Sequence, residues 1–584
     1  MNAVPPHVLS RVLLPQNDLR RDGALCQRTL NPLMQQRVFN VLLLTLGVIG
    51  LALASRIDAA TAATTAPQWQ EVELTFTATR DTANPYTDAE AWTEFTHDDG
   101  TKLRRPMFWD GGRTFRVRFA STKSAGTWRW TSSDRDGDAG LNGKSGTLAA
   151  APAASETATI FTRHGFWSIP PGGRNLIHAD GRARLLCADT PWALPWRATV
   201  EQAEIYARDR QAKGYNAALL MTVQPDMDCK GPRSRTEDLG FDVGFEDLPK
   251  GALRQLRPEY FQMFDRLTGI LVAHGIAPVY QPVFHGYGWK GRRVAGNVVS
   301  AEDYARYCRY LVARYGARPA IWLVGGDGPA TDPTIVAQLD RAGQTIEEWD
   351  AYRQPTGIHY SPHSLYRTHQ DKAWLDFQWC QTGHGGEHVP ERVADMWRNT
   401  PVKAVANGEP TYENIGKTGR GAGWWQGHEA WCNLTAGSTM GLVYGAGSLW
   451  QWRLHAKEPD HADWCTAPGA GWREALDFEG SRYPGIVAKI LDGLPFAEMQ
   501  PNWTYTYGKR GLAVPGKLFV LYLPEGGGTG ITSLDVPRAY RVYDPRTGAE
   551  VGKGLLPDSA PTQFNSGSSG EPRVVVFLSS DRNP

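Results

Sequence analysis

The stretch ARLLCADTPWALP, residues 183–195, decides between the two parallel α/β folds that this chain could adopt. Its first half is a short apolar run, as expected for a strand that is buried on both faces. A doubly wound sheet that binds a nucleotide would place a glycine-rich phosphate turn directly after its first strand. The loop after this strand contains proline and tryptophan instead, so we predict that it opens a (β/α)₈ TIM barrel.

The residues that follow repeat an alternation of strand and helix. Thr199 and Gln202 have the spacing of a capping box, which predicts a helix through Lys213. A second helix is predicted over 258–274, and a third begins at Ser300. Eight apolar segments spread over about 270 residues match the size of such a barrel. The eight predicted strands are 183–190, 215–223, 277–283, 320–327, 356–360, 374–380, 402–409 and 447–452.

The chain on either side of these segments alternates apolar and polar residues with a period of two. EVELTFTAT, residues 71–79, is one example before the barrel, and similar patterns return after residue 502. An Ala- and Pro-rich linker over 149–158 separates the first of these regions from the barrel. We therefore predict an N-terminal antiparallel β-sandwich over 66–150, the barrel over 155–500 and a C-terminal β-sandwich over 501–584.

The only long apolar run, residues 38–54, follows Arg37 and precedes a stretch of small residues. This is the pattern of a secretory signal, so we predict a signal peptide over 34–63 and a secreted or periplasmic protein. Because the signal would be complete from Met34 onward, our hypothesis is that residues 1–33 are a misannotated extension. The alternative is that residues 38–54 remain as a membrane anchor.

Charge and composition narrow the class of partner. The 62 Lys and Arg residues nearly cancel the 61 Asp and Glu residues, which gives no electrostatic footprint for nucleic acid or for a membrane surface. The 22 tryptophans suit an oligosaccharide or polysaccharide, because indole rings cover the apolar faces of sugars, although β-sheet cores would also use them. The seven cysteines are irregularly spaced, and one disulfide, Cys432 with Cys465, is left open.

The catalytic groups of a barrel lie where its strands end, because that face brings together residues that are distant in sequence. Two acids stand at such positions, Asp327 after the fourth strand and Glu409 at the end of the seventh. We predict that the other polar and aromatic residues after the strands bind substrate. They are Asp189, Trp192, His285, Trp289, His359, Gln381, His384, Tyr412, Glu413, Gln451 and Trp452.

Two carboxyl groups across a barrel mouth suit the cleavage of a glycosidic bond. One carboxyl must keep its proton for the leaving oxygen, and the other must stay ionised beside the oxocarbenium-like centre. We predict that Asp327 is the acid and base and that Glu409 is the nucleophile, kept ionised by Asn407, Tyr412 or a histidine. The alternatives are a turn residue for Asp327 and a supporting salt bridge for Glu409. Glu413 is more plausible as a supporting residue than as the nucleophile.

Other chemistries lack their signatures. The sequence contains neither H-E-x-x-H nor a G-x-S-x-G elbow nor a phosphate-binding G-x-x-x-x-G-K-[ST] loop. We therefore expect no metal and no cofactor, and we expect His359 and His384 to bond sugar hydroxyls or the carboxylates. The aromatic run GWWQGHEAW, residues 423–431, either walls a sugar subsite or forms a core helix.

Four motifs resemble, in order, those of the apiosidase-like glycoside hydrolases of family 140. They are CADTPWALP (187–195), AIWLVGGDG (320–328), WLDFQWCQTGHG (374–385) and VANGEPTYE (405–413). The segment over 84–112 with GTWRW (126–130) is similar to the sandwich often found ahead of such barrels, and VYDPRTGAEV (542–551) is similar to the β domain that often ends them. The resemblance implies a barrel with Asp327 and Glu409 as the acid and the nucleophile.

Two departures concern the choice of sugar. Leu442 and Val443 stand where the family resemblance would allow a more polar pair. A long insertion over 228–251 changes the loop after the second strand. We therefore predict an exported, cofactor-free hydrolase of plant-type glycans, such as pectin or hemicellulose oligosaccharides, that retains anomeric configuration. The alternative is a catalytically inactive carbohydrate-binding protein on the same scaffold.

Overall fold

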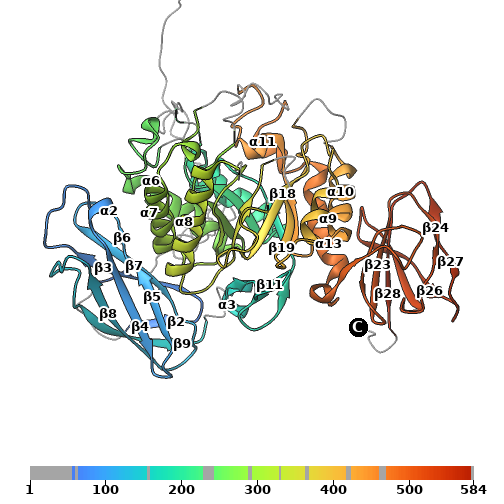
Figure 1. Ribbon diagram of the computed structural model, residues 1–584, viewed down its shortest axis with the longest axis horizontal. Coiled ribbons are helices and arrows are strands. Elements are labelled where there is room, and N and C mark those ends of the chain that lie inside the picture. The colour runs from blue at the N-terminus through green and yellow to red at the C-terminus, as the bar shows by residue number, and fades with distance from the viewer. Residues whose placement is uncertain are drawn as a thin grey trace, which may run out of the picture. The chain divides into compact units, whose positions relative to one another are not determined.

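The fold is seen in a computed structural model of the chain (Figure 1). The residues that it describes all belong to one compact unit, Ala54–Pro584. The predicted extension, almost all of the predicted signal segment, Trp289 and Cys465 lie outside them. No helix within them is both long enough and apolar enough to cross a membrane. The described residues are 56–58, 64–153, 158–225, 227, 243–286, 293–327, 331–361, 367–415, 422–458 and 469–579.

Eight parallel strands form the central barrel, as predicted. They follow one another around the sheet in chain order, and β20 pairs with β13. Beyond the ends of β19 and β20, the Glu413 N–H donates to the Gly445 carbonyl over 2.8 Å, which links the last two strands. The strands are β13 (Leu186–Asp189), β14 (Ala217–Met221), β15 (Ala277–Gln281), β16 (Ile321–Leu323), β17 (Thr356–His359), β18 (Phe377–Gln381), β19 (Ala404–Glu409) and β20 (Gly441–Tyr444).

The eighth strand differs from the prediction. It is the fully buried run Gly441–Tyr444, and the segment 447–452 begins instead as the short helix α11 (Gly447–Trp450). The predicted buried strand contains Ser448 and Gln451, whereas a strand of this barrel is buried on both faces and needs a continuous apolar run. Gln451 and Trp452 therefore follow a helix and do not directly end a strand.

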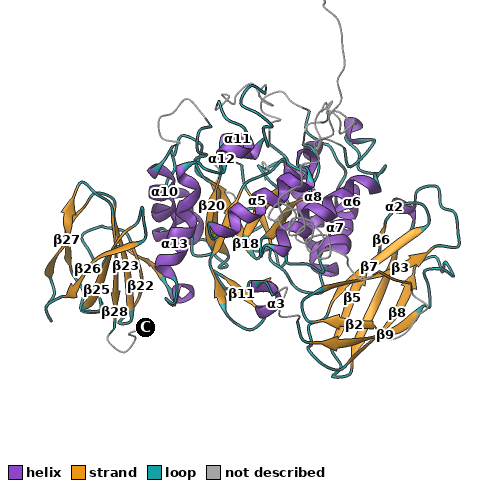
Figure 2. Cartoon of the chain, turned by 180° about the vertical axis from the view of Figure 1, so that it is seen from behind, coloured by secondary structure: helices purple, strands orange, loops and turns teal. Residues whose placement is uncertain are grey.

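Helices cover the outside of the barrel, and each of the long ones buries part of its surface. Thr199 caps α5 (Val200–Ala212) with Gln202 as predicted, and Ser300 caps α7 (Ala301–Tyr315). On α6 (Pro258–Ala273) the apolar stripe of Phe261, Phe264, Leu267 and Leu271 is fully buried. Figure 2 shows these helices beside the barrel strands together with α8 (Pro333–Trp349). The remaining barrel helices are α3 (Ile160–His164), α4 (Leu194–Arg197), α9 (Glu391–Trp397), α10 (Trp424–Thr435), α12 (Trp472–Ala475) and α13 (Tyr483–Leu491).

The N-terminal domain is a sandwich of two sheets, and a short helix, α2 (Pro85–Asp88), follows β3. Stacked rings of Phe95 and Phe119, 4.1 Å apart, join its two layers. The prediction of a purely antiparallel sandwich was incomplete, because β1 lies parallel to β3 and β2 parallel to β9. One sheet contains β1 (Arg56–Asp58), β3 (Glu71–Thr77), β7 (Thr114–Ala120) and β6 (Phe108–Trp109); the other contains β2 (Thr64–Pro67), β9 (Ser145–Ala151), β8 (Thr127–Asp134), β4 (Ala91–His97) and β5 (Lys102–Pro106).

A buried ion network joins this sandwich to the barrel. Asp265 on α6 accepts from Arg118 of β7 over 2.6 Å and from Arg314 of α7 over 2.7 Å. Arg318 of the barrel pairs with Glu71 of β3 over 2.9 Å. These charges are almost completely removed from solvent, so each depends on its partners across the junction. The sandwich is therefore fixed to the outside of the barrel.

The C-terminal domain is also built from two sheets, and a small sheet extends the barrel domain at its N-terminal side. Trp431 on α10 packs in one core cluster with Val520 of the C-terminal domain, which joins that domain to the barrel. The C-terminal strands are β21 (Gln500–Asn502), β22 (Gly511–Val514), β23 (Leu518–Leu523), β28 (Arg573–Leu578), β25 (Ala539–Asp544) and β26 (Ala549–Leu555) in one sheet, with β24 (Gly526–Ile531) and β27 (Thr562–Ser569) in the other; the small sheet contains β10 (Trp167–Ser168), β11 (Leu176–His178) and β12 (Ala183–Arg184).

Candidate active site

The two predicted acids meet at the carboxyl ends of the barrel strands. Asp327 follows β16 and Glu409 is the last residue of β19. An oxygen of each carboxyl group and a ring nitrogen of His359, at the end of β17, all lie within 4.8 Å of one another. Parallel strands deliver their last residues to one face of the barrel, which is why residues so distant in sequence come together.

Asp327 is held in an unusual backbone conformation. Its φ is +52°, in the left-handed region that few residues other than glycine adopt, although Asp tolerates it better than most. Such strain, when it occurs, is concentrated at functional sites. Burial, reinforced by the nearby negative charge of Glu409, raises the pKa of the Asp327 carboxyl well above its ordinary value. Both effects therefore favour the protonated form of Asp327, which is the form that a general acid requires.

The two glycines ahead of Asp327, Gly325 and Gly326, make room for protein side chains. A Cβ added to Gly326 would lie 1.5 Å from the Gln281 Nε2, and one added to Gly325 would lie 2.8 Å from a methyl group of Leu339. The Gln281 amide therefore rests directly on the backbone that leads into Asp327. It is fully buried, and neither its nitrogen nor its oxygen has a hydrogen-bond partner among the described residues.

Glu409 is surrounded by nitrogen groups that lie within reach of its carboxylate oxygens. The Gln381 Nε2 donates to its Oε2 over 2.5 Å, and the His384 Nε2 lies 3.3 Å from its Oε1. The His359 Nε2 lies 3.7 Å from Oε2. Burial lowers the pKa of His359 to about 4, so its ring is neutral at pH 7. Of the donors expected for Glu409, a histidine from a neighbouring strand is therefore in place, and Gln381 joins it.

Gln381 links the two acids. Besides Glu409, its amide nitrogen donates to the Asp327 Oδ1. A carboxamide nitrogen carries two hydrogens, so one can point at each carboxyl group. Because Gln381 ends β18, which lies between β17 and β19 in the sheet, its position follows directly from the strand order.

One wall of the site is aromatic. The Trp192 Nε1 donates to the Tyr412 hydroxyl over 2.7 Å, and the Trp192 ring lies parallel to the ring of His359 with centroids 6.4 Å apart. The Tyr412 ring in turn contacts His384, with centroids 4.6 Å apart. His384 is the most open of these residues, since about a quarter of its side chain is exposed (27%). Four predicted substrate-binding residues therefore surround the carboxyl pair.

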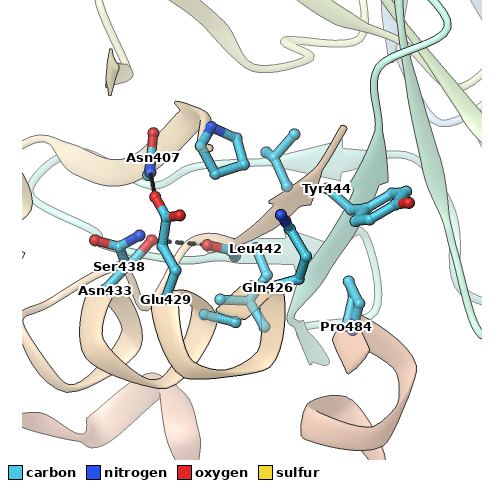
Figure 3. A pocket seen from close by; sticks show the side chains of 12 residues that line it. Asn407, Gln426, Glu429, Asn433, Ser438, Leu442, Tyr444 and Pro484 are labelled. Atoms are coloured by element: carbon cyan, nitrogen blue, oxygen red, sulfur yellow. Dashed lines mark hydrogen bonds between the residues drawn. The ribbon is translucent and has the colours of Figure 1, made fainter. Parts of the chain in front are cut away.

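The buried side chain of Glu429 anchors the end of β19 and the loop that follows Glu409 (Figure 3). Glu429 on α10 accepts from the Thr382 hydroxyl over 2.6 Å, from the Asn407 amide over 3.2 Å and from the Thr411 N–H over 3.2 Å. Asn407 also accepts from the backbone N–H of Glu409 over 3.2 Å. Asn407 was expected to donate to the Glu409 carboxylate, but its amide hydrogens point to Thr382 and Glu429 instead. It holds the backbone of Glu409 and does not contact its charge.

An enclosed cavity lies behind this loop, between Glu429 and the strand β20 (Figure 3). Its water-sized space is about 20 Å³, which is enough for roughly one molecule of water. Gln426 and Asn433 line it, and each has a buried polar atom with no partner among the described residues. The run 423–431 is therefore largely a core helix, because its polar side chains serve this interior and not a sugar subsite.

Three of the residues predicted to bind substrate serve the fold instead. Asp189 is fully buried and accepts from Arg210, Tyr206 and its neighbour Thr190. The carboxylate of Glu413 accepts from the N–H groups of Gly423 and Gly480 and from the Tyr444 hydroxyl. Trp452 is fully buried and stacks on Trp472 with centroids 4.9 Å apart. Protein groups already occupy the polar atoms or ring faces that substrate would need.

His285 and Gln451 are both buried, and the described contacts assign neither of them clearly to substrate binding or to the fold. The His285 Nε2 bonds to the Gln338 side chain of α8 over 2.7 Å, and burial lowers its pKa to about 4. Gln451 is buried after α11. Trp289 lies outside the described residues, so its predicted contact with substrate stays a prediction.

The structure adds Gln281 to the candidates, and it gives similar surroundings to Gln224, which directly follows the second predicted strand. Both are buried with amide atoms that have no partner among the described residues. Gln281 ends β15 as Gln381 ends β18, so the strand-end rule would have found it. It was missed because the predicted strand ran on to Val283, two residues too far.

Asp327, His359 and Glu409 could also surround a divalent cation, since their ligand atoms are close enough. Two features weigh against this use. The Gln381 N–H groups point at both carboxyl groups, and a cation would face these donors across the oxygens. Burial also favours the protonated form of Asp327, whose proton a cation would have to displace.

Comparison with protein families finds two matches along the chain. The model of the apiosidase-like catalytic domain matches residues 170–498, and a domain of unknown function, DUF5060, matches residues 65–135. Curated proteins provide no match.

The solved structures that resemble the chain share its fold. A glycoside hydrolase family 5 protein from Bacteroides vulgatus is 18% identical, with a TM-score of 0.60 over 73% of this chain and 95% of the other. A second Bacteroides vulgatus protein, assigned to the glycoside hydrolases, is 16% identical, with a TM-score of 0.65 over 88% of this chain and all of the other. Because the family model spans more than half of the sequence, the chain belongs to the apiosidase-like family of glycoside hydrolases.

Proposed function

We propose that the enzyme hydrolyses glycosidic bonds in plant-type glycans, such as pectin or hemicellulose oligosaccharides, with retention of anomeric configuration. The observation that carries the proposal is the close approach of Asp327 and Glu409, whose nearest paired oxygens lie within 4.8 Å. Retaining glycosidases hold their carboxyl groups about 5–5.5 Å apart, and inverting enzymes hold them roughly 6.5–9.5 Å apart to admit a water molecule. The short separation favours direct attack by a carboxylate.

In the first step, Glu409 attacks the anomeric carbon while Asp327 gives its proton to the leaving oxygen. The bond to the leaving group breaks, and the sugar is left as an ester on Glu409. Asp327 suits this role because its raised pKa favours the protonated form that donates to the leaving oxygen. Gln381 and His384 stabilise the negative charge on Glu409 before the attack.

In the second step, Asp327 acts as a base. Its carboxylate takes a proton from a water molecule, which attacks the anomeric carbon and releases Glu409. Two inversions at one carbon restore the starting configuration. His359 is neutral and fully buried beside both acids, so it is suited to bond a sugar hydroxyl without adding charge to the site.

The class of glycan rests on the family, since members are named for the release of a sugar found in plant glycans. Export rests on the sequence of residues 34–63. Strand β1 (Arg56–Asp58) falls inside that segment, so cleavage before Ser55 would keep β1 and cleavage before Thr64 would remove it. Amino-terminal sequencing of the exported protein should begin near Ser55 or Thr64, and an intact Met1 would reject this part of the proposal.

The hydrolase proposal is tested with a panel of pectin and hemicellulose oligosaccharides, whose products are identified by mass. Asp327→Asn and Glu409→Gln should each lower the rate on the best substrate at least about a hundredfold. Asp477→Asn, an exposed carboxylate of the barrel (89% exposed), is the matched control and should cleave at the normal rate. Wild-type rates in both active-site variants would overturn the proposal, as would a glycan that binds and stays intact with the wild-type enzyme.

A further inference from the structure

A second cavity lies away from the carboxyl pair, at the junction of the N-terminal sandwich and the barrel. Its volume is about 620 Å³, within the range of roughly 300–1,000 Å³ that is typical of small-molecule sites. Three segments line it. They are residues 78–85 after β3, the hairpin between β6 and β7 around Trp109, and the barrel loop with Glu246, Gln255 and Leu256.

Trp109 supplies an aromatic wall that is fixed in advance. Its Nε1 donates to the Gly112 carbonyl over 2.8 Å, within its own hairpin, and its ring is only partly buried. Because the indole N–H is already used, the ring offers its face to a ligand. The tip of the hairpin lies against the start of α6, since a Cβ on Gly111 would be 3.7 Å from Pro258. A side chain held in this way loses little entropy on binding.

The polar lining is balanced in charge. Arg113 and Asp81 form a bidentate pair with contacts of 2.7 and 2.6 Å. Arg80 and Glu246 add one charge of each sign, so the four ionised groups that line the cavity cancel. Such a lining does not select a phosphate or a strongly acidic ligand. The planar groups of Arg113 and Asp81 can form hydrogen bonds beside the face of the Trp109 ring. A neutral sugar chain binds through contacts of these two kinds.

The opposite wall belongs to the catalytic domain. Glu246 and Gln255 lie in the connection from β14 to α6, which leaves the barrel at the same end as Asp327 and Glu409. The Glu246 N–H donates to the Gln255 carbonyl over 2.9 Å, which holds these two residues beside each other. The Asn84 amide of the sandwich donates to the Arg254 carbonyl over 2.8 Å, which ties the two walls together.

We propose that the cavity around Trp109 is an accessory binding site for a neutral segment of a polysaccharide, separate from the site that cleaves it. The ligand class rests in part on the proposed function, while the cavity, the fixed indole and the balanced charges are independent of it. The accessory site would hold the enzyme on its polymer, and it would have no role in the cleavage of a short oligosaccharide.

The test measures binding with the full chain carrying Glu409→Gln, so that bound glycan is not consumed. Soluble arabinan, galactan and xylan serve as neutral probes in native affinity electrophoresis. Trp109→Ala should lower the affinity for the polysaccharide that binds at least tenfold. Ala83→Trp should do the same, because it places a bulky ring in the cavity from an exposed position without removing any contact. Tyr507→Ala, which removes an exposed aromatic ring of the C-terminal domain, is the control and should change affinity less than twofold.

Catalysis separates this proposal from the hydrolase proposal. With Glu409 intact, Trp109→Ala should cleave a trisaccharide within twofold of the normal rate and the polysaccharide several-fold more slowly. If the wild type cleaves no glycan but Trp109→Ala and Ala83→Trp still weaken binding, the hydrolase proposal fails and the accessory site stands. Unchanged affinity in both cavity variants, or the absence of polysaccharide binding by the Glu409→Gln chain, would overturn the accessory site.

Discussion

Asp327 and Glu409 bring their carboxyl oxygens within 4.8 Å of each other at the mouth of the barrel. At this distance two buried negative charges repel, so one proton stays on the pair. Desolvation of the Asp327 carboxyl group favours the proton there, and Glu409 has His384 beside it in addition to the Gln381 amide that both acids share. The difference in surroundings gives two carboxyl groups two different tasks.

The raised pKa of Asp327 predicts how activity depends on pH. As pH rises through this pKa, Asp327 loses its proton and kcat/KM for a glycoside with a poor leaving group should fall. In a dinitrophenyl glycoside of the same sugar, the dinitrophenolate leaves without being protonated. The decline of kcat/KM at alkaline pH should therefore be much weaker for this substrate. The measurement is kcat/KM against pH for both substrates. Identical alkaline limbs would show that Asp327 is not the acid.

Gln381→Ala should slow catalysis without unfolding the barrel. The substitution removes the donor that faces both acids, and the loss of one such donor typically costs about a hundredfold in kcat. Gln378→Ala on the same strand is the matched control, because its amide bonds to Gln370 and faces away from the pair. Comparable losses in the two variants, with similar melting temperatures, would contradict the assignment of Gln381.

Gly326→Ala should disturb the site through Gln281. The new methyl group would overlap the Gln281 amide, so we expect a loss of activity of about tenfold or more and lower stability. Shortening Gln281 to Ala in the same chain should restore much of the stability, because it removes the overlapping atoms. A double-mutant cycle measured by urea unfolding gives the coupling between the two residues. Additive effects would mean that they do not contact.

Asp265→Asn should weaken the junction between the sandwich and the barrel. Arg118 and Arg314 hold the pKa of the Asp265 carboxyl well below its usual range, and without its charge they are buried with too few partners. We expect a loss of about 3–5 kcal/mol in the free energy of unfolding at pH 7.

The pH dependence of that loss has a defined sign. Because the folded pKa is depressed, the stabilisation by Asp265 is fully present above its unfolded pKa of about 3.9 and disappears as pH falls toward the folded value. Urea unfolding of both chains should therefore show a difference that is constant near pH 7 and shrinks in acid. A difference that does not change with pH would point to a loss of packing alone.

The barrel was predictable because its strands have a simple signature. Runs such as Ala277–Gln281 are buried on both faces and are apolar throughout, and caps such as Thr199 and Ser300 mark where helices begin. The last strand was misplaced because GSLWQW, residues 447–452, also contains tryptophan and leucine at strand-like spacing. Local pattern alone does not distinguish such a segment from a short buried helix.

The acids were predictable, but the partners of other strand-end residues were not. Position at a strand end shows which face of the barrel a residue is near, and this was enough for Asp327 and Glu409. It does not reveal that Arg210 from α5 neutralises Asp189 or that the N–H of Gly480 reaches Glu413. Those partners come from later parts of the chain and are brought in by tertiary packing, which a strand-end rule does not include.

The stereochemistry of the first product tests the central claim most directly. Proton NMR of the anomeric signal, recorded within the first minutes of hydrolysis and before mutarotation, shows which anomer the enzyme releases. The close approach of Asp327 and Glu409 predicts that the product first appears with the configuration of the substrate. First release of the opposite anomer would mean that water attacks directly, and it would contradict the role of Glu409 as nucleophile.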